Sequence, residues 1–92
     1  MTVLIVGADK LGKLPQELEQ HGCQEVIHWA GRKKTSVKKE IPINVDFVVI
    51  LHDYVSHRLM NSIKGQAKRL RLPVVFSKRS VADIKGKFIS RI

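Results

Sequence analysis

The sequence is poor in cysteine and aromatic residues and has no long apolar run. One of its 92 residues is a cysteine, Cys23, and 5% are aromatic. A single thiol excludes an internal disulfide and fits a reducing cytoplasm. No apolar stretch approaches the ~20 residues of a membrane helix, and the N-terminus lacks the basic region of a signal peptide. We therefore expect a cytoplasmic protein with no membrane partner.

Acidic residues are also scarce, and the imbalance is local. The chain has 17 Lys+Arg and 8 Asp+Glu, a net charge of +9. Residues 1–31 have a net charge of −2, whereas residues 32–92 have a net charge of +11. So basic a surface favours a polyanionic or phosphate-bearing partner. Because aromatic stacking platforms are lacking, nucleic acid would be bound mainly through its backbone. The alternative is a solvated basic loop that keeps the protein soluble.

Short β-branched runs alternate with helical patterns along the chain. Apolar runs predict four buried strands, at residues 3–6, 25–29, 46–51 and 74–76. Apolar residues at helical spacing predict three helices, the second over 59–70 and the third over 80–92. The first is marked by Leu11, Leu14 and Leu18, and Pro15 must lie in its first turn. The capping box of Ser80 and Asp83 begins the third of these helices. Residues 30–44 are polar and basic and are expected to form a long connector.

This element order predicts an α/β fold in a single domain over residues 1–92. Strands that alternate with helices imply a parallel sheet. Right-handed crossovers favour the strand order 2-1-3-4. We therefore expect a three-layer, Rossmann-like or flavodoxin-like half domain with about three helices. Within it, Cys23 and Trp29 are expected to fill the core.

Polar residues follow each predicted strand, where open parallel sheets bind ligands. One group has the small or cationic side chains that suit a phosphate: Gly7, Arg32, Ser77, Lys78, Arg79 and Ser80. A second group could position the ligand: Asp9, His28, Asp53, Ser56 and His57. The competing interpretation is that Asp53 or Ser56 caps the second helix and that Ser80 caps the third.

Two other chemistries remain open for the same residues. His28, His52 and His57 could bind a metal or ligate a haem, and a small hydrolase-type enzyme could use the same histidines. A dinucleotide fingerprint is disfavoured, because Asp9 stands where its middle glycine belongs. We expect a non-catalytic module that binds a phosphate-bearing ligand, either a nucleotide or a nucleic-acid backbone. A homodimer also remains open.

Segments after all four predicted strands resemble a known family, the bacterial domain of unknown function numbered twenty-three twenty-five (DUF2325). The resemblance covers essentially the whole chain and rests on Gly7, His28 with Gly31-Arg32, Asp53-x-Val55-Ser56-His57 and Ser77-Lys78-Arg79-Ser80. It implies a small bacterial protein or C-terminal module with a Rossmann-like fold and no settled activity. It emphasises the same strand-end residues.

Overall fold

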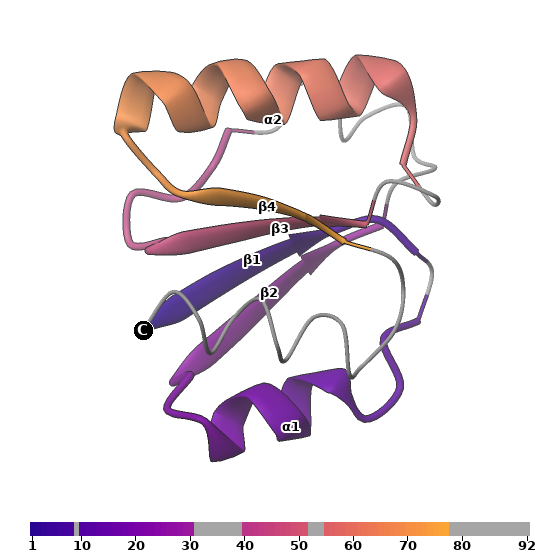
Figure 1. Cartoon of the computed structure of the whole chain (residues 1–92), viewed down its shortest axis with the longest axis vertical. Coiled ribbons are helices and arrows are strands. Elements are labelled where there is room, and N and C mark those ends of the chain that lie inside the picture. Colours follow the sequence, from indigo (N-terminus) through magenta and orange to yellow (C-terminus); the bar gives the residue numbers. More distant parts are fainter. Residues whose placement is uncertain (9, 31–39, 52–54, 78–92) are drawn as a thin grey trace.

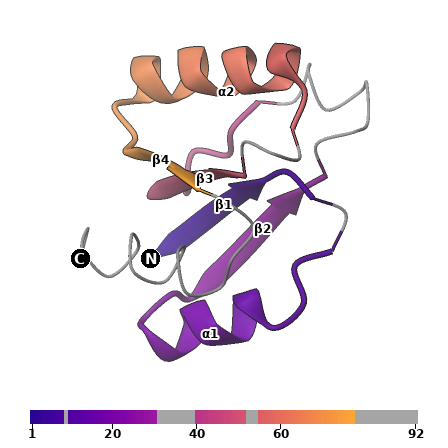
Figure 2. The same cartoon turned by 45° about the vertical axis from the view of Figure 1, so that its right-hand side comes forward.

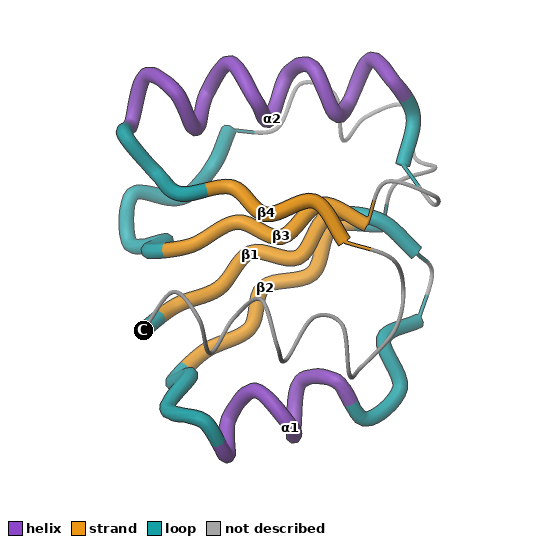
Figure 3. The backbone as a smooth tube through the Cα atoms, viewed as in Figure 1, coloured by secondary structure: helices purple, strands orange, loops and turns teal. Residues whose placement is uncertain are grey.

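Four parallel strands form the middle layer of the molecule, with a helix against each face (Figure 1). The structure is a computed structural model and describes residues 1–8, 10–30, 40–51 and 55–77. The elements in chain order are β1 Thr2–Val6, α1 Leu14–Gln20, β2 Glu25–Trp29, β3 Phe47–Leu51, α2 His57–Leu70 and β4 Val74–Ser77. The sheet has the order β2-β1-β3-β4 and every pair is parallel, which confirms the predicted fold class (Figure 3).

The alternation of side chains along each strand divides the core into two clusters. Val3 and Ile5 of β1 pack on the side of α1, with its Leu14 and Leu18. Leu4 and Val6 face the other way, toward α2. Both sets are fully or almost fully buried, as expected for a parallel sheet covered on both faces. Trp29 belongs to the α2 cluster and is buried, which confirms its predicted place in the core.

Helix α1 is short, and it begins at the point that Pro15 predicts. Leu11 lies in the turn before it, where Gly12 has a φ of 59°, a left-handed value that interrupts a right-handed helix. Pro15 occupies the first turn, where its missing N–H is harmless. Gly22, with a φ of 97°, lies just beyond the last turn and lets the chain leave the helix.

Helix α2 has clear signals at both ends. At its start, the hydroxyl of Ser56 accepts a hydrogen bond from the Leu59 backbone N–H at 3.2 Å. At its end, Arg71 takes the left-handed conformation and Leu72 N–H donates to the Ala67 carbonyl at 2.9 Å. This 6→1 bond is the Schellman motif that commonly ends helices. The capping interpretation of Ser56 is therefore correct.

Residues 40–46 lead into β3 and pack against α2 on the way. The buried amide of Gln66 accepts a hydrogen bond from the Ile41 backbone N–H at 2.7 Å. This bond ties the connector to α2, and Ile41 and Val45 pack into the α2 cluster. The predicted third helix, over residues 80–92, lies outside the described residues.

Candidate functional site

The carboxyl ends of all four strands meet at one edge of the sheet (Figure 2). The strands end almost in register, since Val6 pairs with both Trp29 and Ile50, and Leu51 pairs with Ser77. The residues that end the four strands therefore lie close together here, although they are far apart in the sequence. This is the edge at which the polar strand-end residues were predicted to gather.

His28 ties two of these strand ends together. Its Nε2 lies 2.9 Å from the carbonyl oxygen of Gly7 and 3.0 Å from that of Ala8. Carbonyl oxygens only accept hydrogen bonds, so Nε2 must carry the proton and donate to both. The ring is half-buried and holds the loop after β1 against the end of β2. Its place at the edge was predicted; its bond to the backbone was not.

The loop that His28 holds has an uncommon backbone conformation. Gly7 has a φ of 115° and Ala8 a φ of 64°, so two consecutive residues are left-handed. Glycine adopts such values freely, whereas alanine does so at a cost in free energy. The Gly7 N–H still donates to the Trp29 carbonyl at 2.8 Å, which extends the pairing of β1 with β2 beyond Val6. The loop is therefore fixed on both sides.

Helix α2 begins at the same edge. Ser56 caps it, and His57 and Arg58 follow in its first turn with exposed side chains. That turn contains no acidic residue. The N-terminal ends of helices carry a partial positive charge and normally attract acidic side chains. Here the first turn contains an arginine and a histidine in place of acidic side chains.

The structure locates five of the predicted site residues. Gly7, His28, Ser56 and His57 lie at the carboxyl edge as just described, and Ser77 ends β4 with a fully buried side chain. A ligand at the surface would therefore not touch the Ser77 hydroxyl unless the site rearranged. The remaining predicted residues lie outside the described residues: Asp9, Arg32, His52, Asp53, Lys78, Arg79 and Ser80.

The described residues offer little to a metal ion. They contain no group of three or more histidine, cysteine, aspartate or glutamate side chains with metal-binding geometry. Nε2 of His28 is engaged with backbone carbonyls, which leaves Nδ1 for any ligand. His57 is exposed on α2. Of the three histidines considered for a metal or haem, His52 lies outside the described part of the chain.

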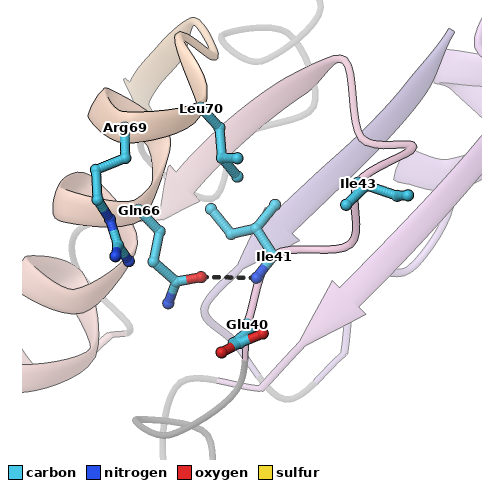
Figure 4. A pocket seen from close by; sticks show the side chains of 6 residues that line it. All are labelled: Glu40, Ile41, Ile43, Gln66, Arg69 and Leu70. Carbon is cyan, nitrogen blue, oxygen red and sulfur yellow. Dashed lines mark hydrogen bonds between the residues drawn. The ribbon is translucent and has the colours of Figure 1, made fainter.

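A pocket that the sequence did not reveal lies at the other end of α2 (Figure 4). Its volume is about 270 Å³, and it is lined by Glu40, Ile41, Ile43, Gln66, Arg69 and Leu70. The Gln66–Ile41 hydrogen bond crosses it, and the Ile43 side chain is 98% exposed beside it. Because this contact joins a connector to a helix 25 residues later, no local pattern could predict it.

Comparison with known proteins gives one match. The model of a family described as uncharacterized proteins conserved in bacteria, DUF2325, matches residues 2–88. The chain belongs to this family. Membership confirms the resemblance noted in the sequence, and the family's description names no ligand or reaction. No curated protein and no solved structure matches the chain. Among the described residues, neither helix is long and apolar enough to cross a membrane.

Proposed function

We propose that the chain is a non-catalytic binding module for a phosphate-bearing ligand, a nucleotide or a nucleic-acid backbone, held at the carboxyl ends of the strands. The observation that carries this proposal is the first turn of α2, where His57 and Arg58 stand at the positive end of a 14-residue helix without a carboxylate. The positive charge of Arg58 and the partial positive charge of the helix N-terminus repel each other, and both would attract a bound anion.

The neighbouring strand ends support the same ligand. Gly7 is buried, so it serves the site by letting the chain turn after β1, with a φ of 115° that glycine adopts freely. His28 fixes that loop and keeps it in one conformation, which lowers the entropy cost of binding. Lys78 and Arg79 directly follow β4 in the sequence and add two cations after a strand that ends at this edge. The single buried thiol suits a reducing cytoplasm, where we place the protein.

A titration with two defined probes tests the proposal. Inorganic phosphate and ATP are added to ¹⁵N-labelled protein while amide NMR signals are followed. We expect saturable shifts at Gly7, Ser56 and His57, and a stronger response to ATP because it presents more phosphate oxygens. The Lys78→Ala/Arg79→Ala variant should bind ATP about tenfold more weakly, with a flatter salt dependence.

A variant with the same change in net charge controls for the long-range field. Lys64→Ala/Lys68→Ala removes two cations from the exposed side of α2 and should retain ATP affinity within about twofold, as expected for charges screened beyond the Debye length of ~10 Å. Shifts confined to other parts of the chain would contradict the proposed site. So would unchanged binding in the Lys78→Ala/Arg79→Ala variant.

A further inference from the structure

The solvent side of α2 carries cations in two rows. Residues three or four positions apart share one side of a helix, so Lys64 and Lys68 form one row. Arg58 and Arg69, eleven positions apart, lie along the other. All four side chains are exposed. No acidic residue occurs between positions 55 and 77, so nothing on the helix itself neutralises them. We call the surface formed by these four side chains, Asn61 and Gly65 the α2 basic face.

Gly65 lies between the two rows, and the fold gives no reason for a glycine there. Its φ is not left-handed, and a Cβ built on it would meet no atom within 4 Å. It is exposed and lies in the middle of the helix, where glycine is destabilising relative to alanine. A glycine that neither packing nor backbone geometry requires is explained if a partner approaches the helix backbone closely at this point.

We propose that the α2 basic face binds duplex nucleic acid through its phosphate backbone, with one strand passing over Gly65 between the rows of cations. This surface shares Arg58 with the carboxyl-end site, but its other residues lie farther along α2, and the inference does not depend on the ligand proposed there. Arg58 to Arg69 span about 16 Å of helix, which is long enough to meet several successive phosphates. A straight row of cations on a rigid helix suits the regular backbone of a duplex.

Two features favour a nucleic-acid backbone over other anionic partners. Membrane-surface helices insert an apolar side into lipid. The apolar residues Leu59, Ile63 and Ala67 of α2 are instead at most 1% exposed, packed against the sheet. Helix α2 itself has no Phe, Tyr or Trp on which unpaired bases could stack. The neighbouring ring of Phe76 on β4 is already engaged by the Lys64 ammonium group, which lies 5.5 Å from the ring centroid. Recognition by phosphate contacts alone predicts binding that depends strongly on salt and little on base sequence.

Fluorescence anisotropy with a labelled 20-base-pair DNA duplex tests the charge part of the proposal. The Lys64→Gln/Lys68→Gln variant should bind about tenfold more weakly at low salt. Its plot of log affinity against log salt should be shallower by about two, roughly one for each phosphate that the variant leaves without a cation. The matched control is Lys10→Gln/Lys13→Gln, which removes two exposed cations just before α1, the helix that covers the opposite face of the sheet. It should stay within about threefold of the parent chain.

Substitutions at Gly65 test the close approach. Gly65→Ala should raise Tm by about 2–8 °C, because alanine favours the helix and its methyl group meets open space. The same change should weaken duplex binding about threefold, and Gly65→Leu should weaken it more than tenfold. If Gly65 had a purely structural role, a substitution that raises Tm would not also weaken duplex binding.

Three outcomes would overturn the inference. The first is an equal loss of affinity in the Lys64/Lys68 and Lys10/Lys13 variants, which would indicate attraction to net charge alone. The second is full duplex affinity in Gly65→Leu. The third is a Lys64/Lys68 effect on binding to vesicles of anionic phospholipid but not on binding to DNA. The same variants titrated with ATP separate this surface from the carboxyl-end site, since ATP binding there should be unchanged.

Discussion

At the scale of single residues, His28 shows how a candidate ligand-positioning side chain can act through the backbone. Its Nε2 donates to two carbonyls, one of which belongs to Ala8, a residue with a positive φ. The imidazole therefore stabilises a backbone conformation that alanine adopts only at a cost in free energy. Whatever ligand binds after β1 meets a loop whose shape depends on this histidine.

His28→Ala should lower the free energy of unfolding by about 1–3 kcal/mol, because it leaves two part-buried carbonyls without their donor. Urea denaturation followed by circular dichroism measures this change. His28→Gln keeps an N–H donor on a side chain of similar reach and should recover part of the loss. Equal stability of His28→Ala and the parent chain would show that the loop does not need this hydrogen bond.

Cys23 is a buried thiol whose protonation depends on folding. Burial raises its pKa above the ordinary value, and backbone hydrogen bonds from Glu25 and Val3 oppose that rise only in part. The protonated thiol donates to the Glu25 carbonyl at 3.2 Å. The folded state thus holds its proton at a pH where the unfolded chain releases it. Stability from this group is complete below the unfolded pKa and is lost as the pH rises through the folded pKa.

Alkylation with iodoacetamide at pH 8 should therefore be much slower in the folded protein than in urea, as measured by mass spectrometry. Chemical denaturation between pH 8 and 10 should show a fall in stability that Cys23→Ala lacks. Fast alkylation of the native chain would contradict the buried position of Cys23.

At the scale of elements, the end of α2 contains a residue that its geometry does not favour. Arg71 has a φ of 58° at the position where Schellman motifs usually place glycine. Arg71→Gly should raise the free energy of unfolding by about 0.5–1 kcal/mol, because it removes the left-handed strain. Thermal unfolding measures this. As a control, Arg69→Gly inside the helix should lower stability by about 1 kcal/mol, although it removes the same charge.

The apolar patterns predicted the strands and helices well, because burial alone determines which positions along them are apolar. Strands β1 and β3 are buried on both faces, so their apolar runs could be recognised without knowing their partners. The start of α1 followed from Pro15, which is tolerated only in the first turn, although the leucine spacing continues back through Gly12. The α2 pocket could not be predicted, since it depends on a contact between Gln66 and Ile41. Long-range contacts of polar side chains produce no periodic pattern in the sequence.

The candidate site was predictable to the same limited extent. Topology places the residues after each strand at one edge, so the location of Gly7, His28 and Ser56 followed from the strand order. Their partners did not follow from it. His28 and Ser56 both bond to backbone groups, which any sequence supplies. Sequence thus indicates where side chains gather more reliably than what each one contacts.

At the scale of the whole molecule, the net charge of +9 links stability to the anions in solution. Self-repulsion of a basic chain weakens the folded state, and any salt relieves it by screening. An ion that also binds the folded state specifically adds stability by RT ln(1 + [L]/Kd). Chloride and phosphate at equal ionic strength therefore separate general screening from a binding site.

We expect Tm to rise with sodium chloride and to rise further with sodium phosphate at the same ionic strength. At ten times its Kd, phosphate contributes about 1.4 kcal/mol. For a chain of this size that corresponds to roughly 5–10 °C, measured by scanning calorimetry. The phosphate-specific part should disappear in the Lys78→Ala/Arg79→Ala variant and persist in Lys64→Gln/Lys68→Gln. Identical Tm values in the two salts would show that the carboxyl-end edge has no site for free phosphate, and that the basic surface acts through its field alone.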